Sequence, residues 1–111
     1  MSFTNEIATY QLIYFCKRRK DSDHITQISL HNADHRFLGY VYFYRDNQEL
    51  PDSYSIEDVT PKRAFLRMHE SQLDEVVDML RNEKPCHLYY GSPANAYLYT
   101  GTEPIGEEES E

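Results

Sequence analysis

The sequence predicts a single α+β domain, in which a curled antiparallel sheet of about six strands packs on one main helix. One stretch, at about residues 71–83, has the periodicity of an amphipathic helix. Six other stretches are short and rich in β-branched and aromatic residues, and turn-forming residues separate them. The chain has 111 residues, which is the length of one domain.

The helix is predicted from apolar residues that recur at positions i, i+3, i+4 and i+7, namely Leu73, Val76, Val77 and Leu80. Ser71, with Asp74 three residues later, resembles a capping box at the beginning of the helix. Pro85 follows the periodic stretch and ends it.

The predicted strands are residues 9–18, 25–31, 36–45, 63–69, 86–90 and 96–102. The first three have short links and therefore form an antiparallel meander. The last two form a hairpin with residues 91–95 as its connection. The segment 46–61 is a long polar connection that either packs down through its three large apolar side chains or is mobile.

The strand 36–45 alternates between two faces. Phe37, Gly39, Val41 and Phe43 are expected on one side, and the other side is expected to carry Leu38, Tyr40, Tyr42 and Tyr44. Because both sets are apolar or aromatic, this strand should lie inside the sheet.

The charge of the chain is concentrated at one end. The chain carries 19 acidic and 11 basic residues, a net charge of −8, and five of the acids are glutamates within residues 103–111. This segment has too little apolar surface to fold, so we expect a disordered acidic tail after a domain of residues 1–102.

Several classes of protein are disfavoured by composition. The longest apolar runs, at 12–16 and 37–44, are far shorter than the roughly 18 residues of a membrane span. The order of basic and apolar residues near the start does not fit a secretory signal, so a cytoplasmic protein is expected. Two cysteines, Cys16 and Cys86, are too few for a disulfide framework and are expected to be buried thiols. The basic run 17–20 is followed at once by aspartates, and nucleic-acid binding is disfavoured by the net charge.

The sequence indicates no cofactor, metal or catalytic set. His31 and His35 have the spacing of zinc ligands on a helix, but they flank a predicted turn. Cys86 and His87 are neighbours in a predicted strand and should point to opposite faces, so His87 cannot act as the base for Cys86. An enzyme is the third hypothesis, and it would require a cluster such as His69, His87 and a carboxylate around one pocket.

The predicted order leaves too little helix for the sheet. Six strands about 4.8 Å apart span roughly 24 Å, whereas a helix with its side chains is about 10 to 12 Å wide. Either the sheet curls around the helix, or a second copy or another protein covers the remaining apolar surface.

The ten tyrosines are the most informative residues for function. Tyr40, Tyr42 and Tyr44 share one strand face, Tyr97 and Tyr99 share another, and Tyr10 and Tyr14 share a third. If these faces lie on the same side of the sheet, they form one tyrosine-rich wall suited to binding. In the simpler interpretation, the rings only complete a thin core.

The leading hypothesis is a non-catalytic protein that acts by protein–protein association, first with itself as a homodimer, through a tyrosine-rich sheet face. The candidate binding residues are Tyr40, Tyr42, Tyr44, Tyr97 and Tyr99. The alternative is a small-ligand-binding domain, with a pocket between the sheet and the segment 46–61 that Tyr40, Tyr42 and Tyr44 line.

Overall fold

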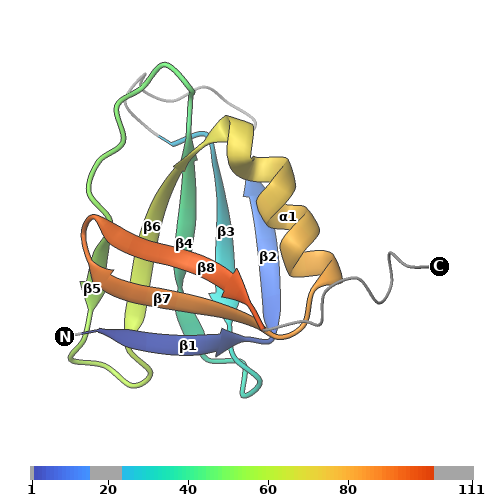
Figure 1. Cartoon of the computed structure of the whole chain (residues 1–111), viewed down its shortest axis with the longest axis vertical. Coiled ribbons are helices and arrows are strands. Elements are labelled where there is room, and N and C mark those ends of the chain that lie inside the picture. The colour runs from blue at the N-terminus through green and yellow to red at the C-terminus, as the bar shows by residue number, and fades with distance from the viewer. Residues whose placement is uncertain (1, 16–23, 102–111) are drawn as a thin grey trace.

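The computed structural model describes residues 2–15 and 24–101, which form one α-helix and two β-sheets (Figure 1), so the α+β class is confirmed. The elements in chain order are β1 (Phe3–Ile7), β2 (Thr9–Tyr14), β3 (Thr26–His31), β4 (Phe37–Tyr44), β5 (Tyr54–Ile56), β6 (Arg63–His69), the 3₁₀ turn η1 (Glu70–Gln72), α1 (Leu73–Asn82), β7 (Cys86–Ser92) and β8 (Asn95–Thr100).

The strands divide between two sheets. The larger sheet has the order β2-β3-β4-β6-β5, and the smaller sheet has the order β1-β7-β8. The predicted meander is present as β2, β3 and β4, which are antiparallel neighbours. β4 and β6 run parallel, and the long connection between them makes this possible, since parallel neighbours need a crossover of a dozen or more residues. The structure thus differs from the expected single antiparallel sheet of about six strands.

Two strands were not expected from the sequence. β1 pairs with β7, with Phe3 opposite Tyr90 and Ile7 opposite Cys86. β5 lies within the polar connection 46–61 and pairs with β6. The same connection is fixed at its start, where the His69 Nε2 donates to the carbonyl of Gln48 at 2.8 Å.

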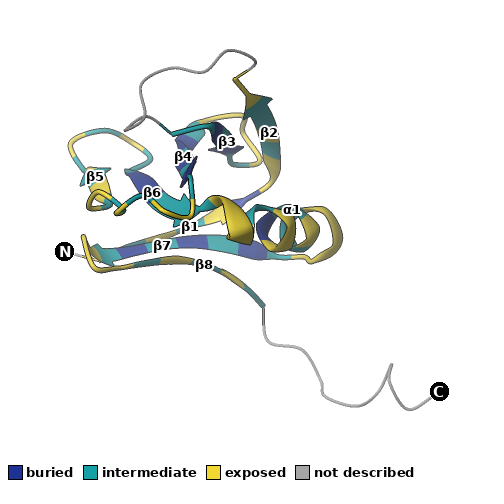
Figure 2. Cartoon of the chain, turned by 90° about the horizontal axis from the view of Figure 1, so that it is seen from above, coloured by how far each residue is buried: buried dark blue, intermediate teal, exposed yellow. Residues whose placement is uncertain are grey.

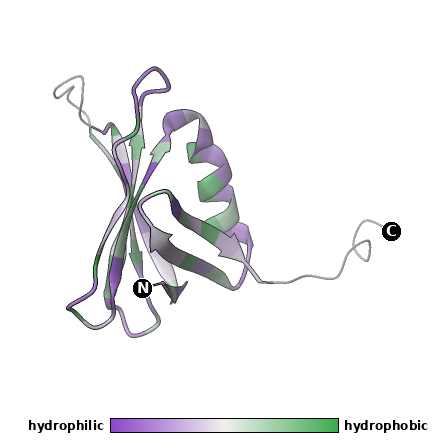
Figure 3. Cartoon of the chain, turned by 60° about the vertical axis from the view of Figure 1, so that its left-hand side comes forward, coloured by the Kyte–Doolittle hydropathy of each residue, from purple (hydrophilic) through white to green (hydrophobic). Residues whose placement is uncertain are grey.

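The smaller sheet and α1 together form a layer over the inner face of the larger sheet (Figures 2 and 3). The core between the layers is built from both sheets and the helix, and its buried members include Ile28, Leu30, Val41, Phe43, Leu66, Leu88 and Val76. The smaller sheet and α1 together therefore cover the inner face of the larger sheet, which one helix alone is too narrow to cover.

The helix begins differently from the prediction. The backbone N–H of His69 donates to Gln72 Oε1 at 3.2 Å, and the backbone N–H of Ser71 donates to Asp46 Oδ1 at 3.1 Å. The predicted Ser71–Asp74 capping box is wrong, because η1 begins before Ser71. The carboxylate that accepts a hydrogen bond at the beginning of the helix belongs to Asp46, in the connection 46–61. α1 then covers most of the predicted range.

Some predictions fall on other parts of the chain. Cys16, the basic run 17–20 and the acidic segment 103–111 lie outside the described residues. Within the described residues, no helix has the length and apolar character needed to cross a membrane.

Candidate functional site

The outer face of the larger sheet carries a cluster of aromatic side chains that strand register brings together. Tyr40, Tyr42 and Tyr44 of β4 lie opposite Phe65, Arg67 and His69 of β6. Tyr54 of β5 lies opposite Phe65 on the other side. We call this surface the aromatic face and define it by Phe37, Tyr40, Tyr42, Tyr44, Tyr54, Phe65, Arg63 and Arg67.

The rings of the aromatic face contact one another around Phe65. The ring of Tyr54 stacks on Phe65, with centroids 4.7 Å apart and planes 12° apart. The centroids of Tyr40 and Tyr42 lie 5.9 and 6.5 Å from that of Phe65. Tyr40 also lies edge-on to Phe37, at 4.9 Å. Offset and edge-on pairs of this kind stabilise an aromatic cluster beyond the burial of its area.

A β-bulge decides which residues of β4 join this face. The register between β3 and β4 shifts at His31, which pairs with Phe37. Gly39 has a φ of 137°, and an added Cβ would lie 1.7 Å from the carbonyl oxygen of Ala64. The expected alternation is therefore wrong before Gly39: Leu38 is buried in the core, whereas Phe37 joins the tyrosines on the outer face.

Two arginines of β6 lie on the rings. The Arg67 guanidinium is 4.9 Å from the ring centre of Tyr42 and 5.3 Å from that of Tyr54. It also donates hydrogen bonds to the hydroxyl of Tyr44 and, at 3.2 Å, to the carbonyl of Asp52. The other guanidinium, of Arg63, lies 5.3 Å from the ring centre of Phe37. The aromatic face thus includes two guanidinium groups that make cation–π contacts with its rings.

Exposure differs across the aromatic face and is greatest at Tyr54, on the β5 edge. Phe65 and Tyr44 are buried beneath their neighbours, Tyr40 and Tyr42 are half-buried, and Tyr54 is 39 % exposed. Burial, and then the hydrogen bond with Tyr54, raise the pKa of the Tyr42 phenol. The face therefore has a packed centre and an accessible edge.

A second aromatic cluster lies on the outer face of the smaller sheet. His87 stacks on Tyr99 with centroids 4.9 Å apart, and Tyr89 stacks on Tyr97 at 4.7 Å. Tyr97 and Tyr99 are 45 % and 36 % exposed. The smaller sheet lies on the inner side of the larger one, so this second cluster faces away from the aromatic face (Figure 3).

The tyrosines therefore do not form one continuous tyrosine-rich wall. The structure brings Tyr40, Tyr42 and Tyr44 together but separates them from Tyr97 and Tyr99, which belong to the other sheet. Tyr10 and Tyr14 share the face of β2 that lies opposite the buried residues of β3, so they belong to the inner side of the larger sheet.

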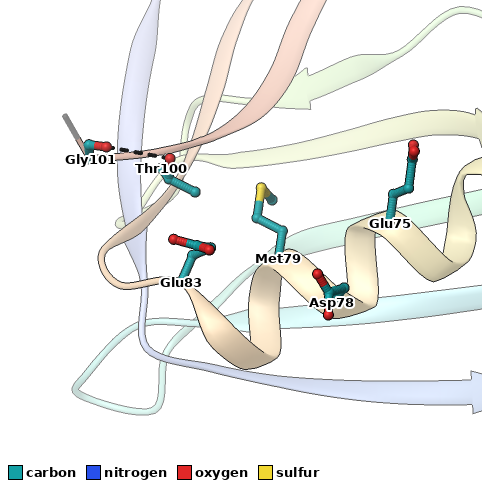
Figure 4. Close-up of a pocket in the computed structure, with 6 residues that line it drawn as sticks. All are labelled: Glu75, Asp78, Met79, Glu83, Thr100 and Gly101. Carbon is teal, nitrogen blue, oxygen red and sulfur yellow. Dashed lines mark hydrogen bonds between the residues drawn. The ribbon is translucent and has the colours of Figure 1, made fainter. Parts of the chain in front are cut away.

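Several cavities lined by described residues lie away from the aromatic face. One is a hollow between α1 and the end of β8, where the carboxylates of Glu75, Asp78 and Glu83 lie around Met79 (Figure 4). Others lie between α1 and β2 or beside the end of α1. None of these hollows includes Tyr40, Tyr42 or Tyr44, so the small-ligand alternative has no support among them.

Cys86 and the histidines of the described residues do not form a metal site. Within residues 2–15 and 24–101, no group of three or more His, Cys, Asp or Glu side chains could hold a metal ion. Cys86 is buried and contacts the carbonyl oxygens of Glu83 and Met79 at 3.3 and 3.6 Å. His69 belongs to β6 of the larger sheet, whereas His87 belongs to the smaller sheet. The cluster that an enzyme would require is not formed by these two histidines.

No protein-family model, no curated protein and no solved structure matches the chain.

Proposed function

We propose that this protein acts by protein association, first with a second copy of itself, through the aromatic face. The observation that carries the proposal is the packed cluster of tyrosine, phenylalanine and arginine side chains on a sheet face that no described element covers (Figures 2 and 3). Tyrosine and arginine are enriched at the energetic centres of protein interfaces, because both combine a broad flat surface with hydrogen-bonding groups.

A second copy is the partner that the face suits best. Most soluble assemblies are isologous dimers, in which one patch meets itself. In such a dimer the guanidinium of Arg67 can lie between aromatic rings of both copies, and such a contact is stronger when water is excluded. The net charge of −8 opposes a polyphosphate partner for the same face.

The size of the face predicts a weak association. The whole outer face of the larger sheet, with five strands about 4.8 Å apart and about six residues along a strand, measures roughly 19 Å by 20 Å, or on the order of 400 Å². The aromatic face occupies only β4, β6 and β5 and is smaller than this. Two such faces bury an area near or below the roughly 1,000 Å² expected of a stable interface. We therefore expect a dimer that forms and dissociates with concentration.

Sedimentation velocity over about 1 μM to 500 μM tests this proposal. The test compares Tyr54→Arg, at the accessible edge of the aromatic face, with Tyr97→Arg, a similarly exposed tyrosine of the other sheet. The expected result is a sedimentation coefficient that rises with concentration in the natural protein and in Tyr97→Arg, but not in Tyr54→Arg. A monomer at all concentrations, or equal loss in both variants, contradicts the proposal.

A further inference from the structure

β8 is an edge strand of the smaller sheet, and its free edge can pair with one more strand. The N–H of Gly101 donates to the carbonyl of Pro85 at 3.0 Å. In an antiparallel pair, every second residue directs its backbone N–H and C=O groups to the partner strand. The backbone groups of Tyr99 and Tyr97 therefore also form hydrogen bonds with β7. Leu98 and Thr100 therefore direct their N–H and C=O groups to the free edge. Among the described residues, these groups have no hydrogen-bond partner.

A groove lies between this free edge and α1, and its first part is mainly apolar. Its lining includes Met68 of β6, Val76 and Met79 of α1 and Leu98 of β8, beside the polar side chains of Gln72 and Glu75. Both methionines are half-buried rather than buried. Flexible thioether side chains are common where a surface must accept varied apolar groups.

The second part of the groove is acidic. Glu75, Asp78 and Glu83 line it opposite Thr100, and all three are exposed (Figure 4). Glu75 and Met79 line both parts, so the two hollows join into one groove along β8. Within the lining of either part, no lysine or arginine offsets the carboxylates.

We infer that this groove binds an extended basic peptide of another protein, which adds to β8 as a fourth strand of the smaller sheet. Peptides that bind in this way gain affinity from backbone hydrogen bonds and specificity from alternate side chains. Leu98 and Thr100 point to the inner side of the sheet, so the peptide residues opposite them point into the groove. The apolar part selects an apolar residue opposite Leu98, and the carboxylates select lysine or arginine opposite Thr100, two positions away.

The inference is independent of the aromatic face, which lies on the other sheet. A small ligand fits the groove less well, because it would leave the repeated backbone groups of Leu98 and Thr100 without partners. The added strand would also lie between β8 and α1, within the layer that covers the inner face of the larger sheet.

The probe is a labelled peptide of sequence acetyl-Thr-Val-Thr-Lys-Thr-Val-Thr-amide, which presents the same spacing of valine and lysine in both directions. Its binding is measured by fluorescence anisotropy, with a control peptide in which glutamate replaces the lysine. Glu75→Lys should weaken binding about tenfold, whereas Asp74→Lys, with the same charge change at an exposed residue outside the groove, should change it less than about twofold.

Two further measurements test the geometry. Thr100→Pro removes one N–H at the free edge and should weaken binding at least about fivefold, while the bonds to β7 remain. The bound peptide should slow hydrogen exchange of the Leu98 and Thr100 amides in the natural protein. The inference is overturned if the lysine and glutamate peptides bind equally, if Asp74→Lys weakens binding as much as Glu75→Lys, or if these two amides are unchanged by the peptide.

Discussion

Arg67 and Tyr42 lie directly opposite one another on the parallel strands β6 and β4, and the guanidinium of Arg67 is 4.9 Å from the centre of the Tyr42 ring. The same guanidinium contacts the ring of Tyr54 and donates to the hydroxyl of Tyr44. One side chain thus connects three tyrosines from two strands. The accessible edge of the aromatic face depends on this arrangement.

Replacing Arg67 with methionine should lower the free energy of unfolding by about 1 to 2 kcal/mol. The substitution keeps an unbranched stem but removes the cation–π contacts and the hydrogen bond to Tyr44. Urea denaturation measures the change. Arg81→Met, at an exposed position in the last turn of α1, is the matched control and should cost less than about 0.5 kcal/mol. Equal losses in the two variants would show that Arg67 does not organise the tyrosines.

Gly39→Ala should destabilise the protein by about 3 kcal/mol or more. Its φ of 137° disfavours any L side chain, and the new Cβ would lie 1.7 Å from the carbonyl oxygen of Ala64, which belongs to the backbone of β6. Gly91→Ala is a milder control, since the nearest atom to its Cβ is the Tyr89 hydroxyl, at the end of a side chain that can move. Urea denaturation of both variants gives the comparison. A Gly39→Ala protein as stable as Gly91→Ala would refute the close approach of β4 to β6.

The Tyr42 phenol should make stability fall at alkaline pH. Burial and the hydrogen bond with Tyr54 raise the pKa of Tyr42 above the ordinary value of about 10. The folded protein then holds a proton that the unfolded chain loses, so this contribution is complete below about pH 10 and is lost as the pH rises through the folded pKa. Urea denaturation at about pH 8 and about pH 10.5 should show a smaller decline in Tyr42→Phe than in the natural protein. The same decline in both proteins would contradict this role.

The Cys86 thiol should resist modification in the native protein. Burial, and then the charge of Glu83, raise the pKa of Cys86, and its side chain is enclosed by the end of α1. In a Cys16→Ser background, a thiol-specific reagent at about pH 8 should react with Cys86 only at the rate of unfolding. Rapid reaction that urea does not accelerate would show that the thiol is accessible in the native fold.

Local signals in the sequence were enough to place the helix and six of the strands. The spacing of Leu73, Val76, Val77 and Leu80 is a property of consecutive residues, and so is the alternation of Tyr40, Tyr42 and Tyr44. β1 has only Phe3 and Ile7 as apolar residues, and β5 is three residues long, so neither produces a strong periodic signal.

The division into two sheets depends on contacts between distant residues. β1 pairs with β7, 79 to 87 positions away, and β8, which carries Tyr97 and Tyr99, pairs with the other edge of β7. The sequence alone therefore could not show that they face away from Tyr42. Phe65 and Arg67 alternate with Leu66 and Met68, which is a signal for a strand with an aromatic and basic outer face, but only the parallel pairing with β4 places them beside the tyrosines.

A dilution series of the protein with ring-labelled tyrosines, monitored by NMR, is the most direct test of association through the aromatic face. The resonances of Tyr40, Tyr42 and Tyr54 should shift between about 500 μM and about 10 μM, whereas those of Tyr97 and Tyr99 should stay constant. Unchanged resonances throughout, or shifts confined to Tyr97 and Tyr99, would contradict an interface on this face.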